Sequence, residues 1–210
     1  MNAQPFVNQL IALSVVVDPV GLAPMFAALT QGGSDAYRKS MATRGVTIAG
    51  LLLLAFGFLG DALLHLLGIG FAAFQIAGGI LLLLLAIDML FARHSGLRST
   101  TKTEAREAEL SHDISVFPLA IPLIAGPGAF TTVLLMLRTA HEQTRQVLAS
   151  IGALLLVLAM TLLALRAAGR ILRIIGETGA NVVSRVLGVL LSALAIQFIL
   201  NGLRSGLLHP

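Results

Sequence analysis

The chain contains no cysteine, no tryptophan and few charged residues. Without cysteine it has neither a disulfide nor a thiol site. Charged residues make up 11% of its 210 residues, whereas a soluble domain has about 25%. Hydrophobic residues make up 57% of the chain. This composition predicts an integral membrane protein that is surrounded by a lipid bilayer.

The scarcity of aromatic residues and the absence of catalytic motifs exclude other classes of function. Although the net charge is +4, the basic residues are scattered between apolar segments and only 5% of residues are aromatic. A nucleic-acid partner is therefore not expected. No nucleophile elbow, phosphate-binding loop or zinc-protease motif is present, and the five histidines lack ligand spacing. We expect neither an enzyme nor a site for a metal or cofactor.

Six segments are long and apolar enough to cross a bilayer as helices. They are Phe6–Leu29, Val46–Leu67, Gly70–Phe91, Val116–Leu137, Val147–Ala168 and Val182–Leu203. If the N-terminus lies outside, eleven lysine and arginine residues fall on the cytoplasmic side and three fall outside. Basic residues accumulate in cytoplasmic loops. The sequence therefore predicts an all-α membrane protein with six transmembrane helices and both termini on the extracytoplasmic side.

The third and sixth segments resemble each other. Residues 70–90 align with residues 179–199 without gaps, and this alignment places Gly79 on Gly188. Leucine-rich segments match by chance, so this alignment is modest evidence when taken alone. The alternative to a repeat is that any bundle of six apolar helices shows some self-similarity.

A similar offset, within one residue, brings Pro19 onto Pro127, which strengthens the case for a repeat. We predict two three-helix repeats, residues 1–92 and 114–210, joined by a polar cytoplasmic linker at residues 93–113. Because each repeat crosses the membrane three times, the second is inverted relative to the first. Inverted repeats of this kind recur among transporters.

A helix breaker lies near the middle of the first segment and of the fourth. In Asp18-Pro19-Val20-Gly21 the aspartate is a favoured N-cap, and proline is favoured at the first helical position. Gly126-Pro127-Gly128 has glycine and proline in the corresponding places. We therefore predict that both segments are broken at mid-membrane. Paired interruptions in the two halves of a chain point to a transporter's substrate site.

The two predicted breaks differ in charge. Each half-helix start exposes backbone N–H groups and a partial positive charge, which attract anions. Asp18 adds a negative charge at the first break, whereas Gly126 adds no side chain and leaves the amides around Gly128 free. We expect a zwitterion, with its ammonium near Asp18 and its carboxylate near Gly128. The candidate substrate-binding residues are Asp18, Gly21, Gly126, Gly128, Ala129, Thr131 and Thr132.

No ATP-binding motif is present, so transport would be coupled to a proton or Na⁺ gradient or would be uncoupled. Asp18 is the first candidate for coupling, because burial of a carboxylate favours a bound proton or counter-ion. Asp88 is the second candidate, although an interfacial carboxylate beside basic groups is the simpler interpretation. The abundant glycine and alanine faces would also permit a homo-oligomer.

Several alternatives remain open from the residues. Asp18 can be a structural N-cap alone, and Gly126-Pro127-Gly128 can be a kink that allows close helix packing. The whole chain can be a divalent-cation carrier that uses Asp18 and Asp88, although two acids make a poor cage for an ion that prefers about six oxygen ligands. It can also be a membrane scaffold or regulator that transports nothing.

The two motifs give the chain a resemblance to a known family. Asp18-Pro19-Val20-Gly21 and the run from Ile121 to Ala129 resemble the MarC family of inner-membrane proteins over nearly the whole length. Asn8, Thr131 and Thr132 also fit that pattern. Some members of this family are described as transporters of small neutral amino acids, and the family resembles the LysE-type exporters. The resemblance therefore implies transport of small neutral amino acids or similar metabolites in a bacterial inner membrane. The chain departs from the family at Leu22, where a polar residue is usual.

Overall fold

The computed structural model describes residues 4–91, 113–140 and 143–208, which form helices joined by short connections, with no strand in these ranges. The elements are α1 (Gln4–Val17), α2 (Pro19–Leu29), α3 (Asp35–Leu66), α4 (Phe71–Leu90), η1 (Ser115–Ile124), α6 (Pro127–Ala140), α7 (Thr144–Arg166) and α8 (Ala168–Leu208). Within the described residues, five helical spans are long and apolar enough to cross a membrane, and there are six if the bent pair of η1 and α6 counts as one span. The all-helical membrane fold is confirmed. The linker at residues 93–113 lies, except for Asp113, outside the described residues.

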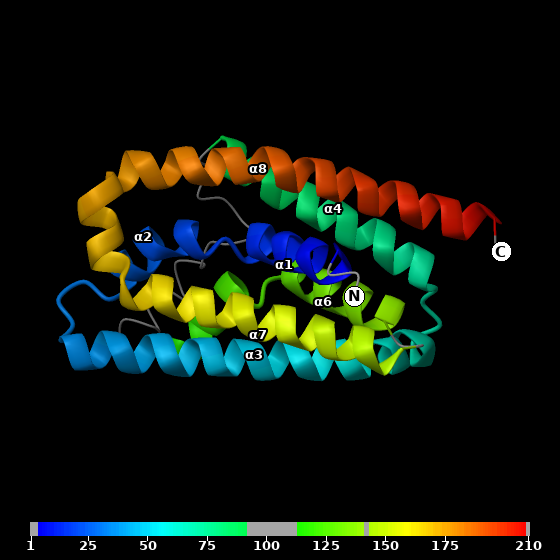
Figure 1. Cartoon of the computed structure of the whole chain (residues 1–210), viewed down its shortest axis with the longest axis horizontal. Helices are drawn as coiled ribbons and strands as arrows, with labels where there is room; N and C mark the ends of the chain where they lie inside the picture. Colours follow the sequence, from blue (N-terminus) through cyan, green and yellow to red (C-terminus); the bar gives the residue numbers. More distant parts are fainter. Residues whose placement is uncertain (1–3, 92–112, 141–142, 209–210) are drawn as a thin grey trace.

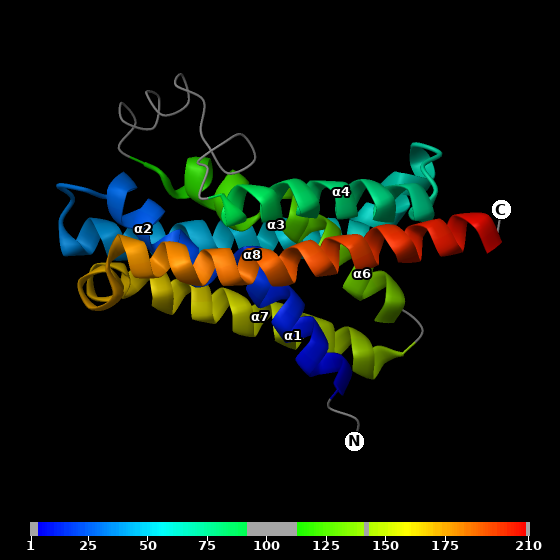
Figure 2. The same cartoon turned by 90° about the horizontal axis from the view of Figure 1, so that it is seen from above.

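The helices run roughly along one long axis (Figure 1). α3 and α7 lie along one side, α4 and α8 lie along the other, and the broken segments α1–α2 and η1–α6 lie between them (Figure 1). Turning the molecule shows α1 slanting away from this bundle towards the N-terminus (Figure 2). The two broken segments therefore contribute much of the core, which contains Leu13, Val17, Leu22, Leu119 and Leu134 among its fully buried side chains.

Two helices extend well beyond their predicted boundaries. α3 begins at Asp35 rather than Val46, and Ser34 caps it by accepting a hydrogen bond from the Tyr37 amide at 3.2 Å. α8 begins at Ala168, and Gly176 interrupts it with a left-handed φ of 65°. The residues before Gly176 cross one end of the molecule, and the rest of α8 runs back along the bundle (Figure 1). The hydrophobicity criterion missed these polar turns because they extend past the apolar spans.

α4 and α8 make the most extensive contact of any described helix pair. A Cβ placed on Gly79 would lie 2.8 Å from the Ala195 carbonyl oxygen and 3.1 Å from the Ile199 nitrogen. A Cβ placed on Gly188 would lie 3.2 Å from the Ala86 carbonyl oxygen. These three atoms belong to the backbone of the facing helix, so the two helix axes approach closely because positions 79 and 188 lack side chains.

The α4–α8 contact is reciprocal under the alignment of residues 70–90 with 179–199. Gly79 corresponds to Gly188 and Ala86 corresponds to Ala195, and each glycine lies against the alanine of the other helix. The helices run in opposite directions (Figure 1). Two elements related by a twofold axis make such paired contacts, in which each residue of one element meets the counterpart of its own partner.

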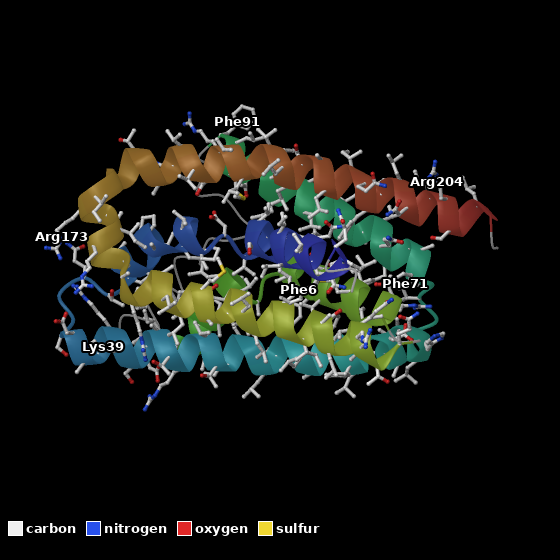
Figure 3. The ribbon with its side chains drawn as sticks, viewed as in Figure 1. Phe6, Lys39, Phe71, Phe91, Arg173 and Arg204 are labelled. Atoms are coloured by element: carbon white, nitrogen blue, oxygen red, sulfur yellow. The ribbon has the colours of Figure 1, made fainter. Side chains whose placement is uncertain are left out.

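Basic side chains lie at both ends of the molecule. Lys39 and Arg173 lie at one end of the long axis, and Arg204 lies at the other (Figure 3). Phe91, just after α4, lies nearer the middle of the axis than Lys39 and Arg173 do (Figure 3).

Candidate functional site

The first break is centred on Asp18, between α1 and α2. Its backbone has φ 50° and ψ 67°, in the left-handed region that aspartate tolerates better than most residues. The Gly21 amide donates a hydrogen bond to Asp18 Oδ1 at 3.0 Å. Pro19 occupies the first position of α2. The predicted N-cap is confirmed, and the residue is only 1% exposed, so a carboxylate is buried at the break.

Ser184 of α8 is a neighbour of Asp18 that the sequence did not reveal. Its hydroxyl donates a hydrogen bond to Asp18 Oδ2 at 3.1 Å across 166 positions of sequence. A Cβ on Gly21 would lie 2.0 Å from Asp18 Oδ2 and 2.6 Å from Ser184 Oγ. Gly21, a candidate site residue, is therefore required for the contact between the other two side chains.

The second break lies between η1 and α6, which are bent by 63° relative to each other. α6 begins at Pro127, as expected, but η1 is less regular than the predicted half-helix. Phe117 and Ile121 inside it have extended backbone angles. Each of them precedes a proline, whose ring disfavours the helical conformation of the residue before it. η1 packs against α3. At membrane depth, non-helical backbone is tolerated where it is buried in protein or lines a water-filled cavity.

A narrow hollow opens at the second break. Gly126, Gly128 and Ala129 line it, and Val16, two residues before Asp18, lies on its wall. The other lining residues come from α4, η1 and the start of α6: Leu81, Leu85, Pro122, Leu123, Ile124 and Pro127. The hollow has room for roughly one water molecule. The two breaks are therefore neighbours, and the space between them is closed to a larger ligand in this conformation.

Thr131 and Thr132 are buried on α6 and use their hydroxyl protons within the helix. Thr131 Oγ1 donates to the Pro127 carbonyl at 2.9 Å, and Thr132 Oγ1 donates to the Gly128 carbonyl at 2.8 Å. A Cβ on Gly78 of α4 would lie 1.9 Å from Thr131 Cγ2. Thr131 thus packs α6 against α4, and each hydroxyl has only acceptor capacity left for a ligand.

Asp88 lies one turn after Leu85 on α4, and Leu85 lines the hollow at the second break. Its side chain is half-buried. In the part of the chain that the structure describes, no three histidine, aspartate or glutamate residues cluster as a metal site would require.

Polar contacts tie the first predicted repeat to the second at one end of the molecule and to the end of the linker at the other. At one end Arg138 of α6 forms an ion pair with Asp61 of α3 and lies 3.9 Å from the ring centroid of Phe71. At the other end Arg44 of α3 lies 3.4 Å from Asp113, beside η1. The pKa of Asp113 lies below its ordinary value. The main cause is the hydrogen bonds that Asp113 accepts from Ser115, and the positive charge of Arg44 adds a smaller effect.

Comparison of the sequence with known proteins identifies its family. A family model described as "MarC family integral membrane protein" matches residues 3–207. A UPF0056 membrane protein of Methanocaldococcus jannaschii is 36% identical and is aligned over 99% of this chain and 100% of its own. UPF0056 membrane protein YhcE of Escherichia coli is 35% identical over 92% of this chain and 89% of its own. UPF0056 membrane protein YvbG of Bacillus subtilis is 34% identical over 94% of this chain and 93% of its own. No solved structure matches the chain significantly.

Proposed function

This chain belongs to the MarC family of integral membrane proteins, and we propose that it is a secondary transporter of small neutral amino acids or similar zwitterions. The observation that carries this proposal is the buried carboxylate of Asp18 at a helix break next to a second break. An ionisable residue inside a transmembrane segment is costly and marks a substrate or ion pathway. Asp18 binds the ammonium, and the amides around Gly128 bind the carboxylate.

The reciprocal crossing of α4 and α8 supports two inverted repeats as the architecture of this transporter. In inverted-repeat carriers, one repeat rocks against the other around a site near the midplane. The break between α1 and α2 lies alongside the middle of α3 and α7 (Figure 1). We place the substrate there, with each repeat contributing one break.

The small size of the hollow at the second break and the polar contacts at both ends of the molecule support an occluded state of the proposed transport cycle. Arg138 joins the two repeats at one end through Asp61, and at the other end Arg44 of the first repeat pairs with Asp113, the last residue of the linker before the second repeat. Rocking towards either side would separate one of these pairs and widen the space between the breaks. Asp18, with Asp88 as a second carboxylate, would couple this motion to a proton or Na⁺ gradient.

The charge distribution supports an orientation for the protein in the membrane. The end with Lys39 and Arg173 faces the cytoplasm, following the bias of basic residues. Both termini then lie on the extracytoplasmic side, and in a bacterium the bilayer would be the inner membrane.

A thermal-shift screen on the purified protein in detergent tests the proposed substrate class. We expect millimolar glycine, L-alanine or L-serine to raise the unfolding temperature, by about 5 °C at a hundredfold excess over Kd. Mn²⁺ and D-glucose serve as comparison ligands and should shift it little. Stabilisation by Mn²⁺ alone would favour the cation carrier, and no shift with any amino acid would contradict the proposal.

A further inference from the structure

Ser184 contacts the buried carboxylate of Asp18 from a helix that the sequence motifs do not involve. It lies on α8, in the second predicted repeat, whereas Asp18 lies at the first break of the first repeat. The 3.1 Å hydrogen bond between Ser184 Oγ and Asp18 Oδ2 therefore joins the two halves at the buried carboxylate. α2 and α8 also pack against each other around this contact.

The chemistry of this pair suits a group with several N–H donors. A serine hydroxyl has one proton to donate and two lone pairs that accept. In the structure its proton points to Asp18, so the lone pairs remain to receive further donors. An ammonium has three donors, and it can bond to the carboxylate and the hydroxyl oxygen together. An anion would meet a carboxylate and the oxygen lone pairs, both of which repel it.

Gly21 holds the two oxygen atoms at this spacing. Its own amide occupies Asp18 Oδ1, which directs Oδ2 towards α8. Any side chain at position 21 would collide with both Asp18 Oδ2 and Ser184 Oγ. Gly21 thus fixes the positions of the Asp18 carboxylate and the Ser184 hydroxyl relative to each other.

We infer that Ser184 is a ligand-positioning residue that binds the substrate's primary ammonium together with Asp18. This inference rests on the proposed function and adds α8 to the site. Because Ser184 moves with the second repeat and Asp18 with the first, an ammonium held by both oxygen atoms favours the closed arrangement of the two halves. The site therefore selects ligands with a primary ammonium over those whose nitrogen is fully methylated.

The test is a titration of L-alanine against wild type, Ser184→Ala and Ser184→Thr, with the thermal shift as the readout. Loss of a hydrogen bond to a charged group is expected to raise the Kd of Ser184→Ala about tenfold. Ser184→Thr keeps the hydroxyl and should bind within about threefold of wild type. Without ligand, Ser184→Ala should unfold at a lower temperature than wild type, because the buried Asp18 Oδ2 loses a hydrogen-bond donor, whereas Ser184→Thr keeps this donor and should unfold near the wild-type temperature. A second titration with glycine betaine should give no shift in wild type.

Each outcome separates this inference from the proposed function. Wild-type affinity in Ser184→Ala, with loss of binding in Asp18→Asn, overturns the role of Ser184 and leaves the transporter proposal standing. Equal loss in Ser184→Ala and Ser184→Thr assigns the effect to packing and also overturns it. Binding of glycine betaine as tightly as L-alanine contradicts the ammonium contact. If no amino acid stabilises wild type, both proposals fail together.

Discussion

Replacing Asp18 with asparagine is expected to weaken L-alanine binding at least tenfold while leaving the protein folded. Asparagine is as good an N-cap as aspartate and tolerates the left-handed backbone of this position. It can keep the bond from the Gly21 amide, which is 3.0 Å long in the structure. It removes the negative charge that faces the ammonium, and a charge-assisted hydrogen bond is about twice as strong as a neutral one. The measurement is the L-alanine Kd by thermal titration.

Asp18→Ala is the matched control for the capping role. Alanine removes both the charge and the cap, so it should lose binding and also about 1 kcal/mol of stability. The two variants therefore separate capping, which asparagine keeps, from ligand binding, which both lose. If Asp18→Asn bound L-alanine with wild-type affinity, Asp18 would be a structural cap and the zwitterion site would be misplaced.

Gly79→Ala is expected to destabilise the protein by about 1–3 kcal/mol, because overpacking a close contact forces the neighbouring backbone to move. The new methyl group would lie 2.8 Å from the Ala195 carbonyl oxygen and 2.7 Å from Ile199 Cγ1. A backbone oxygen cannot rotate aside as a flexible side chain can. At about 2 to 4 °C per kcal/mol for a chain of this size, the loss is measurable as a lower unfolding temperature.

Gly169→Ala provides the comparison for this substitution. Gly169 also lies in a helix, but a Cβ there would meet no atom within 4 Å. Alanine is the better helix former by about 1 kcal/mol, so this variant should be as stable as wild type or more so. Gly188→Ala, whose Cβ contacts are 3.1 Å and longer, should fall between the two. Equal effects at Gly79 and Gly169 would contradict the close crossing of α4 and α8.

The membrane class and the apolar spans could be predicted from the sequence because both follow from local composition. The boundaries of α3 and α8 could not, since their first turns are polar and the criterion for a span is hydrophobicity. The N-cap at Asp18 and the start of α6 at Pro127 were also predictable, because capping and the preference for proline at the first helical position depend on the residue type and its immediate neighbours. The extended residues Phe117 and Ile121 could have been recognised from the prolines that follow them.

The candidate site shows where sequence reasoning stopped. Ser184 is an ordinary polar residue in an apolar segment, and only the tertiary fold brings it to Asp18. Thr131 was expected to offer a hydroxyl to the substrate, but its methyl group packs against Gly78 and its proton stays within α6. No local pattern reports which face of a helix meets another helix 50 residues away. The glycines at the α4–α8 crossing were a usable signal, because their spacing matched between the two segments.

The most direct measurement is counterflow of radiolabelled L-alanine in proteoliposomes that contain the purified protein. We predict that label accumulates transiently in vesicles preloaded with unlabelled L-alanine and not in vesicles preloaded with buffer. Asp18→Asn, reconstituted to the same density, should lose at least nine-tenths of this signal, in line with a tenfold loss of affinity. Accumulation that is equal in protein-free vesicles, or unchanged in Asp18→Asn, would contradict a substrate site between the two helix breaks.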